Sequence, residues 1–313
     1  MKTREMHNHH FDSEKWESFH FRDDDIIIAT AYKSGTTWMQ NIVLKLVYQG
    51  RELPSDAAKL CPWLDLRVPP IEVQMKDLDA ITDRRQIKTH LRFDALVFNP
   101  KAKYIYIGRD GRDCYMSLVN HYRSGNDTWY SILNETPGLV GDPIPRFHES
   151  LHSETKLFDD WISRGWPSLA GETDGYPFWS LFDNVRSWWE QRHQPNVLFI
   201  HFNDLLKDLS GSVREIAAFL DIPIQEEGFA ALVQSLTFTA MKAECTDPSK
   251  TLVPLAGGIF KQGGESFINK GTNGRWQGVL SESQLALYDA TVSEKLSADC
   301  AAWLEHGKAA VVH

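Results

Sequence analysis

The feature that most constrains the fold is a short β-branched run that leads through a glycine-containing turn into a helix. Residues 26–30 follow a run of aspartates and are typical of a buried strand in a parallel sheet. The turn Tyr-Lys-Ser-Gly-Thr-Thr-Trp occupies positions 32–38, and from residue 37 to residue 48 apolar side chains recur at helical spacing. A strand, a loop and a helix in this order predict an α/β fold.

The rest of the chain repeats this alternation. We expect further strands at 86–89, 104–108 and 196–200, and helices at 110–122, 178–192, 213–220 and 282–295. Such alternation predicts a P-loop-like parallel sheet with helices on both faces, in one domain over residues 1–313. Residues 124–175 lose periodicity and are too long for an ordinary loop, so they predict a lid or insertion. Residues 248–273 are also irregular and rich in glycine.

Composition excludes several classes of protein. The net charge of −9 argues against nucleic acid as a general partner. No apolar run is long enough for a membrane span, and residues 1–11 contain no apolar signal region. The 4 cysteines share no metal-ligand spacing and are expected to be reduced, which fits a cytoplasmic location. Within this acidic chain, basic residues nevertheless occur in a few short segments, namely Lys33, Lys88, Arg109, Arg112, Lys270 and Arg275.

The turn at 32–38 has the chemistry of an anion-binding loop. Backbone N–H groups at the start of a helix converge on an anion, Gly35 allows close approach, and Lys33 adds a positive charge. The nucleotide-triphosphatase pattern is absent, because here the lysine precedes the only glycine. A Lys-Ser-Gly tripeptide alone would be typical of a solvated turn, but its place between a strand and a helix favours anion binding.

This heptapeptide resembles the 5′-phosphosulfate loop of the cytosolic sulfotransferases, although Tyr32 stands where that family usually has proline. The segment from Tyr106 to Ser117 resembles the family's 3′-phosphate motif, with Arg109 and Ser117 in the functional positions. Taken alone, Arg109 would be typical of a surface salt bridge. The resemblance extends over residues 23–277 and is weakest at 124–175. It implies 3′-phosphoadenosine 5′-phosphosulfate (PAPS) as sulfuryl donor and adenosine 3′,5′-bisphosphate (PAP) as product.

A third segment, ending in Trp276, resembles the family signature Arg-Lys-Gly-x-x-Gly-x-Trp. Asn269 stands where the family has arginine, so one guanidinium contact to the 3′-phosphate is lost unless Arg275 compensates. A glycine-rich surface turn would explain the same segment. Phe238 and Met241 lie where the family places an aromatic side chain for adenine, facing Trp38, although core packing would also explain them. The resemblance therefore implies the donor-binding residues Lys33, Ser34, Gly35, Thr36, Thr37, Trp38, Arg109, Ser117, Phe238, Met241, Asn269, Lys270 and Gly271.

The catalytic prediction rests on Lys88-Thr-His-Leu, which ends the second predicted strand and resembles the family segment that carries the catalytic base. One histidine among 12 would more often be structural, but in this motif His90 is the candidate base. Lys33 and Lys88 would stabilise the charge that develops during in-line transfer. No carboxylate cluster suited to magnesium is apparent, so no metal is expected.

The acceptor and the assembly are less constrained. Aromatic residues in the insertion suggest an apolar or aromatic hydroxyl or amine acceptor, but they would equally suit the core of a lid: Trp129, Tyr130, Phe147, Phe158, Trp161 and Trp166. Three alternatives stay open, namely a P-loop kinase or nucleotide hydrolase, a non-catalytic nucleotide binder, and a dehydratase that sulfates an alcohol in order to expel it. The family's dimerisation motif is not recognisable, so a homodimer stays open.

Overall fold

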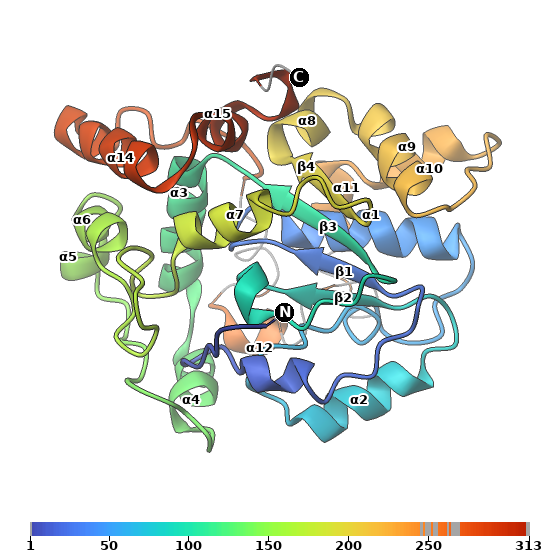
Figure 1. Cartoon of the computed structure of the whole chain (residues 1–313), viewed down its shortest axis with the longest axis horizontal. Coiled ribbons are helices and arrows are strands. Elements are labelled where there is room, and N and C mark those ends of the chain that lie inside the picture. Colours follow the sequence, from blue (N-terminus) through green and yellow to red (C-terminus); the bar gives the residue numbers. More distant parts are fainter. Residues whose placement is uncertain are drawn as a thin grey trace.

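The computed structural model describes residues 2–244, 247, 252, 256–261, 263 and 270–310. Its centre is a 4-stranded sheet in the order β2-β1-β3-β4 (Figure 1). All neighbouring strands are parallel, which confirms the predicted sheet. The strands are β1 (Ile26–Ala29), β2 (Gln86–Thr89), β3 (Lys103–Gly108) and β4 (Val197–His201).

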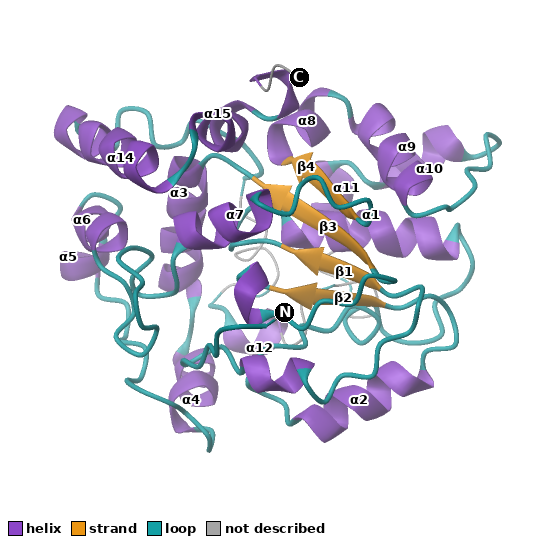
Figure 2. Ribbon diagram, viewed as in Figure 1, coloured by secondary structure: helices purple, strands orange, loops and turns teal. Residues whose placement is uncertain are grey.

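Helices cover both faces of this sheet, as predicted (Figure 2). Alternate residues of a strand point to opposite faces, so Ile26 and Ile28 pack in one core cluster while Ile27 and Ala29 belong to the other. In Figure 1, α7 crosses in front of the sheet, whereas α1 and α11 lie behind it. The first face packs against α1 (Thr36–Tyr48), α9 (Leu209–Phe219), α10 (Phe229–Ser235) and α11 (Phe238–Glu244). The second packs against α3 (Gly111–Ser124), α7 (Leu181–Trp189), α14 (Glu282–Lys295) and α15 (Ala298–His306).

Several helices depart from the sequence-based bounds for local reasons. α7 begins later than predicted because Ser180 caps it, its side chain accepting from the Asp183 N–H. α9 begins earlier because the Asp208 side chain accepts from the Gly211 N–H. The bounds of β2 and α14 match the prediction residue for residue. Other elements were not predicted, namely α2 (Ile71–Ala80), α8 (Phe202–Lys207), α10, α11, α12 (Ala256–Ile259), α15 and the 3-10 turns Ser13–Trp16, Phe93–Ala95 and Lys308–Ala310.

The segment 124–175 is not the irregular stretch that its sequence suggests. It contains α4 (Asp127–Glu135), α5 (Glu149–His152) and α6 (Lys156–Ser163). These helices are short, and their apolar side chains pack into the same core cluster as the second sheet face. Their short length explains why helical periodicity is hard to recognise in the sequence.

The strand ends determine where a site can form. At the amino ends of β1 and β2, the side chains of Asp25 and Arg85 form an ion pair at 2.6 Å, and both are fully buried. At the opposite edge, β1, β2 and β3 deliver their loops side by side, since Ala29 is paired with both Thr89 and Tyr106. Among the described residues, no helix combines the length and the apolar character needed to cross a bilayer.

Candidate active site

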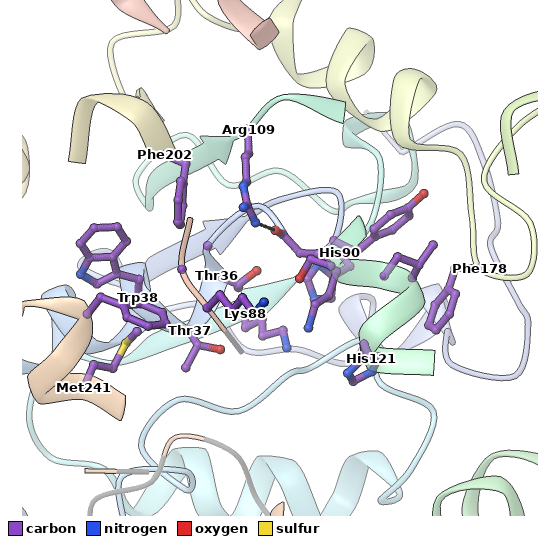
Figure 3. A pocket seen from close by; sticks show the side chains of 18 of the residues that line it. Thr36, Thr37, Trp38, Lys88, His90, Arg109, His121, Phe178, Phe202 and Met241 are labelled. Carbon is purple, nitrogen blue, oxygen red and sulfur yellow. Dashed lines mark hydrogen bonds between the residues drawn. The ribbon is translucent and has the colours of Figure 1, made fainter. Parts of the chain in front are cut away.

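A cavity lies at this carboxyl edge of the sheet and brings the sequence motifs together (Figure 3). Trp38, Phe202 and Met241 lie at one end of it, Phe178 and His121 at the other, and Lys88 and His90 between them. The predicted residues that line the cavity are Lys33, Gly35, Thr36, Thr37, Trp38, Lys88, His90, Arg109, Ser117, Phe238, Met241, Lys270 and Gly271. The predicted Asn269 lies outside the described residues.

The loop between β1 and α1 has the conformation of an anion cradle. Lys33 and Gly35 both have positive φ, 54° and 107°, a conformation in which successive backbone N–H groups can converge on one anion. A Cβ on Gly35 would come within 2.9 Å of the Phe202 ring, so both the conformation and the space require glycine. The Ser34 hydroxyl points away, donating to the Tyr32 carbonyl at 3.1 Å, and Ser34 is not among the lining residues.

Arg109, at the end of β3, joins the three loop segments to one another. Its Nη1 donates to the Lys33 carbonyl at 3.2 Å, and its Nη2 donates to the Thr272 carbonyl at 3.0 Å. Its Nε donates to the Asn273 side chain at 2.9 Å. The Asp113 carboxylate accepts the Gly274 N–H at 2.9 Å. Residues 33, 109–113 and 272–274 therefore form one connected group around the cavity, and Arg109 is buried rather than a surface residue.

At one end of the cavity, aromatic side chains pack around Trp38. Its Nε1 donates to the Leu236 carbonyl at 2.7 Å, and its ring lies 5.3 Å from the Phe202 ring in an edge-on arrangement. Phe238 packs directly over Gly271, where an added Cβ would come within 2.3 Å of its ring. Gly271 is therefore needed for Phe238 to approach. Phe202, which the sequence did not single out, also lies 4.4 Å below the Arg109 guanidinium.

His90 is held in one orientation by its surroundings. Its Nδ1 lies 2.9 Å from the Thr30 carbonyl. A carbonyl only accepts, so Nδ1 carries the hydrogen and Nε2 of the neutral ring keeps its lone pair. The His90 backbone N–H donates to Asp65 at 3.2 Å, and its carbonyl accepts from Asn184 at 2.9 Å.

The buried Asp65 carboxylate accepts hydrogen bonds from three different segments of the chain. Besides the His90 N–H, it accepts the indole N–H of Trp63 at 2.7 Å and that of Trp16 at 3.2 Å. Trp63 in turn lies 4.4 Å below the Lys88 ammonium. One carboxylate thus connects the N-terminal segment, the cavity wall and the residue after β2.

The electrostatics of the cavity favour an anion. Burial, with Lys88 and Arg109 nearby, lowers the pKa of Lys33 to about 7. Burial lowers the pKa of Lys88 to about 8. Burial and the Lys88 charge lower the pKa of His90 well below its usual value, so this imidazole is neutral at pH 7. A bound anion would stabilise the protonated lysines, which otherwise repel one another.

Comparison with known proteins identifies the family. A family model described as a sulfotransferase domain matches residues 23–299. The chain belongs to the sulfotransferase family. The prediction of a sulfotransferase enzyme is therefore confirmed, and the alternative of a P-loop kinase or nucleotide hydrolase is excluded.

Individual relatives agree with this assignment. A glycolipid sulfotransferase of Mycobacterium bovis is 32% identical over 308 residues, covering 95% of this chain and 92% of the relative. Mouse sulfotransferase 1B1 is 29% identical over 291 residues, covering 91% and 86%. Two solved structures share the fold. One is mouse sulfotransferase SULT7A1 complexed with PAP, with 24% identity, a TM-score of 0.65 and coverage of 94% and 93%. The other is retinol dehydratase in a complex with retinol and PAP, with 22% identity, a TM-score of 0.67 and coverage of 91% and 85%.

The far end of this sulfotransferase's cavity consists of residues that the sequence motifs did not assign to the site. They are His10, Trp63, Leu118, His121, Phe178 and Trp179. Phe178 and Trp179 lie within residues 23–277, the stretch that resembles the family, but no spacing rule places His10, Trp63 or His121 beside His90. They come from separate parts of the chain and meet only in the folded protein.

The aromatic residues of the insertion have a different role. None of the six named above is among the lining residues that the structure describes. Five of them are buried in the main core cluster, and Phe147 is packed against it. Trp161 also supports the loop between β1 and α1, because its Nε1 donates to the Tyr32 hydroxyl at 2.7 Å. Of the two explanations of these residues, packing in the core is the one that holds.

Proposed function

We propose that this sulfotransferase moves a sulfuryl group from PAPS to a hydroxyl or amine of a small apolar or aromatic acceptor, with His90 as general base. The observation that carries the proposal is the contact between His90 Nδ1 and the Thr30 carbonyl, 2.9 Å apart. It leaves the Nε2 lone pair of a cavity-lining, neutral imidazole to accept the acceptor's proton.

The residues around the donor end fit PAPS, which supplies the sulfuryl group and leaves as PAP. The start of α1 and Lys33 would hold the 5′-phosphosulfate. Arg109 would bind the 3′-phosphate, with Lys270 and Arg275 of the cavity wall contributing positive charge. The adenine would lie among Trp38, Phe238 and Met241. The PAP complexes of the two structural neighbours support this choice of donor.

In the reaction, His90 Nε2 takes the proton from the acceptor O–H or N–H as that atom attacks sulfur. The bond between sulfur and the bridging oxygen breaks, and its electron pair remains on the 5′-phosphate. Lys33 stabilises this developing charge, and Lys88 neutralises the sulfuryl oxygens. The low pKa of imidazolium at this position favours release of the proton to solvent afterwards. We propose that no metal takes part.

The wall beyond His90 supports an apolar acceptor. Trp63, Leu118, Phe178 and Trp179 offer mainly carbon surface there. Such a wall buries the body of a small aromatic alcohol or amine, while the polar group is directed to His90.

The test compares the wild type with His90→Ala in two measurements. Calorimetric titration with PAP should give dissociation constants within about twofold of each other, because His90 does not belong to the predicted donor-binding residues. Turnover of radiolabelled PAPS with a panel of phenols, alcohols and amines should fall by roughly 100-fold to 10,000-fold in the variant. Retention of most activity would remove His90 from this role. Mass spectrometry of the products distinguishes a sulfate ester from the elimination product of a dehydratase.

Domain organisation, location and assembly also stay proposals. We propose one domain over residues 1–313, a cytoplasmic location and, as one form to be tested, a homodimer. A single cooperative unfolding transition, cell fractionation and sedimentation analysis would test these three statements in turn.

A further inference from the structure

A pair of adjacent histidines before the first strand is connected by a chain of hydrogen bonds. His9 Nε2 lies 2.9 Å from the Pro177 carbonyl, so Nε2 must donate. His9 is fully buried, and burial lowers its pKa to about 3, so the ring is neutral and its Nδ1 has no hydrogen. His9 Nδ1 lies 2.5 Å from His10 Nδ1. His10 Nδ1 is therefore the donor, and His10 Nε2 retains its lone pair.

His10 lines the same cavity as His90. Its ring lies 5.9 Å from that of Trp63 and 5.7 Å from that of Trp179. His90 lies against the same two indoles, at 4.7 Å and 5.7 Å respectively. Phe178 covers His10 at 5.1 Å. Two imidazoles, each with Nδ1 committed to a protein acceptor, thus flank one pair of indoles at the acceptor end.

The groups around His10 favour its role as a hydrogen-bond acceptor. The titratable groups that act on it are His9, His90, His121 and Lys88, and each disfavours its protonated form. The chain from His10 through His9 ends on a backbone carbonyl, which cannot take a proton. The pair therefore fixes the His10 tautomer, with Nε2 as the nitrogen that accepts a hydrogen bond.

We propose that His10 Nε2 accepts a hydrogen bond from a second donor group of the acceptor, so that the preferred substrates are apolar molecules carrying two hydroxyl groups, or a hydroxyl and an N–H. One group is sulfated at His90, and the other is held at His10. His10 is thereby a specificity-determining residue, and His9 is a positioning residue that acts through it. This inference rests on the proposed function and assigns a substrate class to the same site.

The tautomers are tested first, on the whole protein labelled with nitrogen-15 in histidine. Long-range proton–nitrogen spectra, assigned with His10→Phe and His9→Gln, should show His10 protonated at Nδ1 and His9 protonated at Nε2. A His10 ring protonated at Nε2 would overturn the inference, because that nitrogen would then donate. This measurement requires neither PAPS nor an acceptor.

Substrate preference is tested with matched naphthols. In the wild type, kcat/KM for at least one of 2,3-, 2,6- and 2,7-dihydroxynaphthalene should exceed that for 2-naphthol by about tenfold or more, the usual effect of one buried hydrogen bond. In His10→Phe this ratio should fall to about one. His9→Leu should reduce the ratio of the two kcat/KM values. His9→Gln should keep the wild-type ratio, since an amide can donate to the Pro177 carbonyl and accept from His10. Protection of each variant from thermal unfolding by PAP verifies that it is folded.

Two outcomes separate this inference from the function beneath it. If His10→Phe keeps the wild-type ratio, or if no naphthol is sulfated by a protein that binds PAP, the acceptor class is wrong while the donor site stands. If PAP neither binds nor protects the wild type, the proposed function itself fails, and the inference fails with it.

Discussion

The two ends of the cavity are built in different ways. The proposed donor end combines loop backbone and basic side chains from three short segments, which Arg109 and Asp113 hold together by hydrogen bonds. Apolar side chains, namely Trp38, Phe202, Phe238 and Met241, lie beside these segments. The acceptor end consists of imidazole and aromatic side chains from segments around residues 10, 63, 121 and 178. A loop whose backbone must approach an anion needs glycine at a fixed position, so it leaves a recognisable sequence pattern. A wall of side chains needs only residues of suitable shape and polarity, which any segments of the chain can supply once it is folded.

This difference implies that the two ends respond separately to mutation. Changes at the donor end should alter nucleotide affinity and rate together, because the anion and the developing charge share the same residues. Changes at the acceptor end should alter the acceptor's KM and leave PAP affinity unchanged. His90 and Lys88 lie between the two ends, so changes there should affect the reaction of both donor and acceptor.

After His90→Ala, the largest effect is expected for Lys33→Ala. Loss of its charge should lower kcat by roughly 100-fold to 1,000-fold, as for other groups that stabilise developing charge, and should weaken PAP binding about tenfold or more. Turnover of PAPS and calorimetric titration with PAP measure the two effects. A variant with normal PAP affinity and normal rate would contradict the assignment of Lys33 to the donor end.

Arg109→Met should have the next largest effect. It removes three hydrogen bonds that join residue 33 to residues 272–273, and it removes the proposed partner of the 3′-phosphate. We expect PAP affinity to fall roughly 30-fold, since bonds to charged groups each contribute about 1.5–3 kcal/mol. Arg214→Met is the matched control, because Arg214 pairs with Glu226 on the surface. Equal PAP affinities in the two variants would contradict the role of Arg109.

Phe178→Ala tests the acceptor end. Loss of this buried ring should raise the KM of an aromatic acceptor roughly tenfold through lost apolar contact, with the PAP dissociation constant within about twofold of the wild type. Measuring both constants on one preparation is sufficient. A matching loss of PAP affinity would show that the two ends are coupled and that the separation drawn here is wrong.

The smallest effect is a dependence of PAP affinity on pH. The lowered pKa of Lys33, about 7, means that the protein without ligand loses this charge as pH rises through 7. Binding the anion requires the protonated lysine, so affinity should fall with rising pH, by roughly fivefold from pH 7 to pH 8 for one such group. Titrations in buffers of different ionisation enthalpy should reveal proton uptake at pH 8. Lys33→Met should reduce the dependence to the part contributed by Lys88, whose pKa is about 8, and a flat profile in the wild type would contradict the assignment.

Sequence reasoning predicted the sheet and most of the residues that line one end of the cavity, because both leave local patterns. β2 and α14 have the predicted bounds, and the first two of the three loop segments follow the strands β1 and β3. It failed for residues 124–175, where three short helices lie within an apparently irregular stretch. It also missed His10 and Trp63, since their position beside His90 depends on how the N-terminal segment and the edge of β2 pack. No periodicity records such a contact.

The position of Asp65 has a consequence for damage to the chain. This carboxylate receives Trp16, Trp63 and the His90 backbone, so the N-terminal segment supports the acceptor wall from behind. A protease that cut the chain after Trp16 would leave His9 and His10 held by non-covalent contacts alone, while Arg109 and Asp113 keep their own hydrogen bonds. We therefore expect a cut at this point to lower the turnover of acceptors more than the affinity for PAP.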